Sequence, residues 1–117
     1  MKEISKELMA SSLAPIILLI LRRQESYGYE IIQEIERLSG KKLAVAEGTL
    51  YPILKKMEAK EWIAATWKTG STGKERRYYA LTQKGHIELD SQYEQWNFLH
   101  DLINTLWKSP NLTYNRL

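Results

Sequence analysis

The sequence predicts a mainly α-helical fold with one small β-hairpin. Three observations support this prediction. Apolar residues recur at helical spacing in three segments before residue 62, alternate at strand spacing between residues 63 and 81, and return to helical spacing over residues 82–108. The length of 117 residues suits one compact domain with one added element.

The composition excludes several functional classes. Hydrophobic residues make up 44% of the chain and charged residues 26%, which is ordinary for a globular protein. The absence of cysteine excludes a disulfide scaffold and a thiolate zinc site. The two histidines, His86 and His100, are too far apart for one helix turn, so neither a metal nor a cofactor is expected. The apolar run over residues 13–21 is shorter than the ~20 residues of a membrane span, and a cytoplasmic location is expected.

The first helix is predicted over residues 4–23. Its apolar residues lie near helical spacing, and the stretch 16–21 is apolar on all sides, as in a helix buried all round. Pro15 lies inside this segment and removes one intrahelical hydrogen bond. We therefore expect a kink or a break near Ser11–Ser12.

Two further helices complete the first half. A turn over residues 24–28 leads to a helix over 29–38, and Gly40 stops it. After an extended connection over residues 41–46, a third helix is predicted over 47–61, with an apolar face and a basic face.

A β-hairpin follows these helices. Ile63, Ala65 and Trp67 alternate with their neighbours, as in a strand. A Gly-rich turn over residues 70–73 follows, and residues 76–81 alternate again, which indicates the second strand.

The last predicted helix spans residues 82–108, with Thr82 as its N-cap. A helix of ~26 residues is roughly 39 Å long, which is more than a domain of this size needs. It carries a heptad-like apolar stripe, which requires a partner helix, either the N-terminal helix or a second copy of the chain. The stripe consists of Leu89, Tyr93, Trp96, Leu99, Ile103 and Leu106. Residues 109–117 are expected to form a flexible tail.

The positive charge is concentrated in the middle of the chain. Residues 41–84 hold ten basic and four acidic side chains, whereas residues 1–40 hold five and six, and residues 85–117 hold two and four. A localised basic patch is typical of nucleic-acid binding, although a solvated basic surface would give the same count.

Three helices followed by a basic hairpin are the order of a winged helix-turn-helix domain. In such a domain the third helix enters the DNA major groove, and the basic tip of the hairpin lies along the DNA backbone or in the neighbouring minor groove. Tyr51 has an alternative role in packing the third helix. The candidate DNA-binding residues are Glu47, Thr49, Tyr51, Lys55, Lys56, Lys68, Lys74, Arg76 and Arg77.

Three motifs carry a resemblance to a known family. They are Tyr27-Gly28-Tyr29-Glu30-Ile31, the run from Glu47 to Leu54, and the run from Arg76 to Gly85. In this order and spacing they resemble the PadR family of bacterial transcriptional regulators, in its small branch with one C-terminal helix. The resemblance implies a sequence-specific homodimeric repressor that binds double-stranded DNA. It also implies a DNA-binding domain over residues 1–81, whose first helix contributes to the dimer, and a dimerisation helix over 82–108.

The sequence departs from the family pattern at one notable position. Trp62 stands directly after the third helix, where the family often has glycine. A bulky residue does not easily take the left-handed conformation of a helix C-cap, so an altered path from helix to wing is expected.

The resemblance also raises the question of a ligand. Some small members of the family bind planar, often cationic compounds at the dimer interface and then release DNA, with a tryptophan of the C-terminal helix as the stacking surface. The candidate ligand-binding residues here are Leu8, Trp96 and His100. Alternatively, Trp96 only fills space at the dimer interface. The acidic residue is displaced to Asp101, so the charge preference of a ligand stays open.

Two other functional classes fit the sequence less well than a repressor does. A winged-helix protein-interaction module without DNA binding is the alternative, but it would have no reason to gather Lys74, Arg76 and Arg77 on the hairpin. An enzyme is not expected, because no set of residues supplies a nucleophile with its base or a metal cage.

Overall fold

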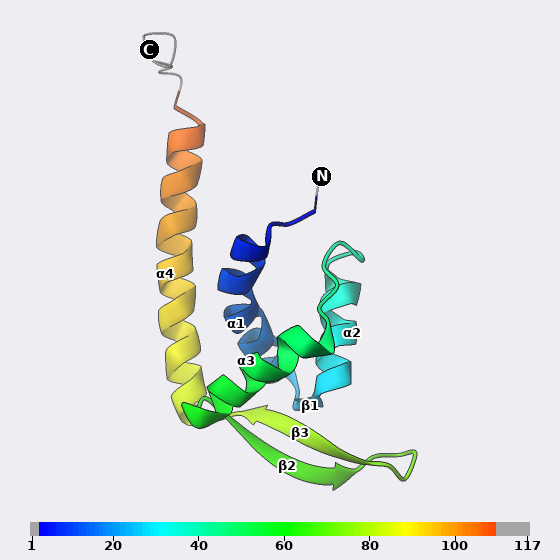
Figure 1. The fold of residues 1–117 in the computed structure, drawn as a ribbon. Coiled ribbons are helices and arrows are strands. Elements are labelled where there is room, and N and C mark those ends of the chain that lie inside the picture. The colour runs from blue at the N-terminus through cyan, green and yellow to red at the C-terminus, as the bar shows by residue number, and fades with distance from the viewer. Residues whose placement is uncertain (1–2, 110–117) are drawn as a thin grey trace.

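The computed structural model describes residues 3–109 (Figure 1). These residues form four helices and three strands, so the predicted mainly helical fold with a small hairpin is confirmed. Residues 110–117 of the predicted tail lie outside the described residues. The elements in chain order are α1 (Lys6–Arg23), β1 (Ser26–Tyr27), α2 (Gly28–Leu38), α3 (Glu47–Ala59), β2 (Ile63–Thr69), β3 (Glu75–Leu81) and α4 (Gln83–Trp107).

Helix α1 is unbroken, which corrects the expected break near Ser11–Ser12. The Ser5 side chain caps its start by accepting the Leu8 N–H at 3.2 Å. Pro15 costs the helix one hydrogen bond, but core packing on both sides of it holds the helical path, since Leu13 and Ile17 are fully buried. No helix within residues 3–109 is both long and apolar enough to cross a membrane.

The segment predicted as a turn over residues 24–28 contains strand β1. Ser26 pairs with Tyr79, and Tyr27 pairs with Tyr78, both antiparallel. The sheet therefore has the order β1-β3-β2. A strand of two residues is too short to show a period, so β1 could not be predicted from the hydrophobic pattern.

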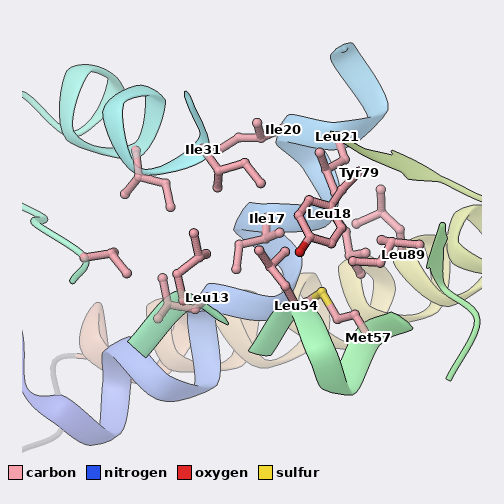
Figure 2. Close-up of a cluster of buried hydrophobic side chains, with 14 of the residues drawn as sticks. Leu13, Ile17, Leu18, Ile20, Leu21, Ile31, Leu54, Met57, Tyr79 and Leu89 are labelled. Atoms are coloured by element: carbon pink, nitrogen blue, oxygen red, sulfur yellow. The ribbon is translucent and has the colours of Figure 1, made fainter. Parts of the chain in front are cut away.

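The core lies between the three N-terminal helices and one face of the sheet. Figure 2 shows side chains of α1 at its centre, facing Ile31 of α2 and Leu54 of α3. Leu43 and Val45, from the connection between α2 and α3, are buried as well. Three helices on a small sheet whose last two strands form a hairpin are the predicted winged helix-turn-helix arrangement.

The sheet has two distinct faces, because successive side chains alternate. Ile63 lies opposite Leu81, and Ala65 lies opposite buried Tyr79, so this face points toward the helices. We call it the inner face. Tyr78 and its cross-strand partner Thr66 lie on the opposite, outer face, so of the adjacent Tyr78 and Tyr79 only Tyr79 packs into the core.

Helix α3 ends in a way that accommodates Trp62 directly after it. Glu61 takes the left-handed conformation, with φ 63°, and Trp62 is the next residue. The Trp62 N–H donates to the Met57 carbonyl at 3.0 Å, and the Glu61 N–H donates to the Glu58 carbonyl at 2.9 Å. This is a Schellman motif, so Trp62 does not need the conformation that a bulky residue disfavours.

Replacing Glu61 by glycine is expected to raise the free energy of unfolding by about 0.5–1 kcal/mol. The left-handed conformation costs an L-residue about 1–2 kcal/mol, and the greater freedom of glycine in the unfolded chain offsets part of the gain. Urea denaturation would measure the change. Glu61→Ala is the control, because it removes the side chain but keeps the strain. Equal stability of the two variants would contradict the prediction.

A tight junction joins the wing to α4. The Thr82 N–H donates to the Trp62 carbonyl at 3.0 Å, and the Thr82 hydroxyl donates to the Glu61 carbonyl at 2.6 Å. The same hydroxyl caps α4 by accepting the Gly85 N–H at 2.9 Å. From this junction α4 runs beside α1 and continues away from the wing (Figure 1), and the molecule measures 65 × 30 × 21 Å.

Candidate nucleic-acid interface

Helix α3 presents a polar face to solvent. Leu50, Leu54 and Met57 anchor it in the core. At 3.6 residues per turn, Lys55 lies on the face away from the core, whereas Lys56 and Thr49 share the edge remote from the wing. The five predicted α3 residues are all exposed: Glu47, Thr49, Tyr51, Lys55 and Lys56.

Tyr51 lies on the edge of α3 that faces the wing and packs on the start of α2. A methyl group at Gly28 would lie 2.5 Å from the Tyr51 hydroxyl oxygen, so the tyrosine ring uses the space that the glycine leaves. The ring is nevertheless 43% exposed. Tyr51 therefore has the packing role and keeps a free surface.

The predicted wing cations fall on two faces of the sheet. Arg77 lies on the inner face, where its Nη2 atom is 2.6 Å from Glu58 Oε2 of α3. Lys68 and Arg76 are cross-strand partners on the outer face. Lys74 lies in the exposed turn between the strands.

The outer-face cations are engaged within the chain. Lys68 forms an ion pair with Glu25 and lies over the Tyr78 ring at 5.7 Å. The Arg76 guanidinium lies 4.3 Å from the centre of the Tyr27 ring. Each contact involves an exposed or half-exposed side chain, so it stabilises the fold only weakly and can be exchanged for a phosphate.

A cleft of about 650 Å³ lies between the start of α2, the start of α3 and the wing. Three cations and one carboxylate line it, so its charge favours an anion. Burial raises the pKa of Tyr79 above its usual value, more than the nearby Arg77 lowers it, so its hydroxyl stays neutral. The lining residues are Tyr27, Gly28, Tyr29, Glu47, Tyr51, Trp67, Lys74, Arg76, Arg77 and Tyr79.

Three residues of the cleft are not among those predicted from the sequence: Tyr27, Tyr29 and Trp67. Strand alternation could have identified Trp67, because Trp67 is four residues after Ile63 and therefore lies on the same, inner face. For the two tyrosines the signal was weaker, since only their places around the start of the second helix set them apart.

A larger hollow, of about 940 Å³, lies between the end of α1 and α2. Its charges balance, with Arg23, Arg37 and Lys41 against three glutamates. Arg37 is also paired with Glu34 at 2.6 Å. The smaller cleft beside α3 is therefore the better site for a polyanion.

The apolar stripe of α4 divides into two parts. Leu89 is only 1% exposed and lies in the chain's own core, which corrects its assignment to a surface for a partner chain. The other five stripe residues are largely exposed: Tyr93, Trp96, Leu99, Ile103 and Leu106.

The candidate ligand residues lie on α1 and α4. Trp96 is 49% exposed, and the His100 ring is stacked on it, with centroids 4.7 Å apart and planes inclined by 10°. His100 Nε2 lies 3.0 Å from the Asn104 side-chain nitrogen. Leu8 on α1 is also exposed.

Comparisons with known proteins agree on one family. The sequence model of the Transcriptional regulator PadR-like family matches residues 17–91. An uncharacterized protein of Lysinibacillus sphaericus is 31% identical over 101 residues, which are 86% of this chain and 93% of that protein. The transcriptional regulator YqjI of Escherichia coli is 31% identical over 88 residues, 75% of this chain but only 41% of that protein.

Solved structures show the same relationship. A PadR-like transcriptional regulator from Bacillus cereus has a TM-score of 0.80 and 30% identity, with 89% of this chain and 99% of that chain covered. A transcriptional regulator from Clostridium thermocellum has a TM-score of 0.78 and 28% identity, with 86% and 97% covered.

Proposed function

Because this chain belongs to the PadR-like family of transcriptional regulators, and is a regulator rather than an enzyme, we propose that it binds specific DNA sequences as a homodimer and represses transcription. One observation carries the proposal. The exposed face of α3, with Lys55 on it, lies beside a cleft that Lys74, Arg76 and Arg77 line. A cationic helix next to a cationic arm suits the two edges of a DNA groove.

Different residues would read the phosphates and the bases. Lys55, Lys56, Lys74, Arg76 and Arg77 are the proposed phosphate ligands. Base contacts would come from the start of α3, through Glu47, Thr49, Tyr51 and Lys55. Lys68 and Arg77 would exchange Glu25 and Glu58 for phosphates when DNA binds, so their contribution is smaller than their charge suggests.

The dimer would form through α4. The proposed division of the chain is a DNA-binding unit over residues 1–81, with α1 contributing to the dimer, and a dimerisation helix over 82–108. Support comes from the exposed stripe between Tyr93 and Leu106, which is apolar and unpartnered within residues 3–109. To read two successive half-sites, such a dimer must hold the two α3 helices about one DNA turn, ~34 Å, apart.

Replacing Lys55 by alanine is expected to weaken DNA binding and to lower the salt slope of the binding constant by about one, because one phosphate contact is lost. Fluorescence anisotropy in a salt series would measure this, with a duplex from upstream of the chain's own coding sequence. Lys6→Ala, at the far end of α1, is the control and should leave the slope unchanged. An unchanged slope for Lys55→Ala would show that this lysine touches no phosphate.

The same assay tests the function itself. Tight binding that a scrambled duplex does not compete away supports the regulator. A failure to bind any duplex, even at low salt, would reject DNA recognition and favour the protein-interaction module.

A second candidate function is the release of DNA by a planar aromatic ligand. It is favoured by the half-exposed Trp96, because two copies near a two-fold axis would form a sandwich for a flat molecule. His100 covers one face of the indole, so a ligand must use the other face or displace the imidazole. Titration with an acridine dye should quench the tryptophan fluorescence and lower the DNA affinity more in the wild type than in Trp96→Phe, which serves as the control for quenching of other tryptophans and for dye bound to the DNA itself. An effect on neither would leave Trp96 with a packing role only.

A further inference from the structure

We propose that Trp67 contacts DNA directly, by packing its indole on a deoxyribose of the strand that lies in the wing cleft. The inference rests on the proposed DNA binding and adds to it an uncharged contact that no basic residue supplies. Trp67 lines the cleft together with Lys74, Arg76 and Arg77.

The position of Trp67 in the sheet explains its exposure. Ile63, Ala65 and Trp67 share the inner face of β2, but Ile63 is 2% exposed and Trp67 is 67% exposed. The inner face of β2 is therefore buried at Ile63 but extends beyond the core into solvent at Trp67. Across the hairpin, Trp67 pairs with Arg77, which reaches back to α3 through Glu58.

The fold does not need this indole. Trp67 is absent from the hydrophobic core cluster and from the partly buried residues packed against it. Trp67 is not an isolated exposed side chain, because exposed Tyr29 and Tyr51 line the same cleft. A cluster of exposed aromatic rings is a feature of binding surfaces, where tryptophan contributes disproportionately to affinity. Trp67 therefore belongs to a contact outside the chain rather than to the core.

The chemistry around the indole indicates the partner. Three cations and one carboxylate, Glu47, line the cleft, and the balance stays positive even though Arg77 is paired with Glu58, so the cleft favours an anionic partner. A DNA strand alternates phosphates with sugars whose C–H groups are apolar. Cations beside an exposed aromatic ring match this alternation, whereas a small anion would leave the indole in water.

The first experiment compares Trp67→Ala with the wild type on a duplex that the wild type selects from a random library. An affinity loss of about tenfold is expected, with an unchanged salt slope because no charge is removed. Lys74→Ala should lower the slope. Thr66→Ala, on the outer face next to Trp67, should change neither quantity.

Two results would overturn the inference. Wild-type affinity of Trp67→Ala would show that the indole makes no contact, and a lowered slope would show that the substitution disturbs the neighbouring cations instead. If the wild type binds neither the selected library nor random duplexes at low salt, the DNA-binding function fails and the inference fails with it.

A second measurement does not depend on a truncated variant. The tryptophans of the wild type can be labelled with fluorine, and Trp67→Phe identifies the Trp67 resonance. We expect that resonance to shift and lose its solvent isotope effect when the duplex saturates the protein. An unmoved Trp67 resonance in a fully formed complex would reject the contact and leave DNA binding intact.

Discussion

Replacing Gly85 by alanine is expected to lower the free energy of unfolding by about 3 kcal/mol or more. A methyl group at Gly85 would overlap the Trp62 carbonyl oxygen and would lie 2.9 Å from the carbonyl carbon and 2.6 Å from Leu81 Cδ1. The carbonyl belongs to the backbone and already accepts the Thr82 N–H, so it cannot rotate away. The start of α4 would have to separate from the wing.

Urea denaturation would measure the loss. Gly48→Ala is a matched control, because Gly48 is also helical and nothing lies within 4 Å of its missing methyl group. That control should be as stable as the wild type or up to about 1 kcal/mol more stable, since alanine favours helix. Equal stability of the two variants would mean that the junction tolerates a side chain.

Replacing Ile103 by glutamate is expected to raise the dissociation constant of the dimer by about a hundredfold or more. Ile103 is in the exposed stripe of α4, and the change would bury one unpaired carboxylate from each chain in the proposed interface. DNA affinity should fall as well, because two separate chains do not bind both half-sites cooperatively.

Analytical ultracentrifugation would measure the dimer, and anisotropy would measure DNA binding. Thr105→Glu is the control, since Thr105 is exposed on the opposite side of α4 and carries the same charge change. A dimer that withstands Ile103→Glu would place the interface elsewhere on the chain.

Long, regular elements could be predicted from the sequence. A two-residue strand could not be predicted, and neither could the continuity of a helix whose internal proline is offset by core packing. Residues 82–108 and the hairpin show many repeats of one period, and their bounds agree with α4, β2 and β3. Strand β1 depends on its pairing with β3, which is distant in the chain. The expected break near Ser11–Ser12 was wrong, because local hydrogen bonding predicts the cost of Pro15 but not the packing that offsets it.

The candidate site was predictable in its residue types but not in its arrangement. Lys68 meets Glu25, 43 residues away, and Arg77 meets Glu58, 19 residues away. No local pattern links such pairs. Leu89 shows why spacing alone does not separate core from surface. The apolar stripe of α4 keeps one period along its length, but it begins in the chain's own core at Leu89 and continues into solvent.

The junction between Trp62, Thr82 and Gly85 gives α4 the mechanics of a lever. The helix is held at one end by hydrogen bonds to the backbone between α3 and the wing, and its other end extends past the rest of the fold (Figure 1). Over 25 residues the arm is about 37 Å long, so a tilt of about 5° at the junction corresponds to about 3 Å at the tip. In the proposed dimer, small displacements between paired arms would thus become rotations of the two α3 helices, and the proposed DNA binding would respond to events far from the DNA.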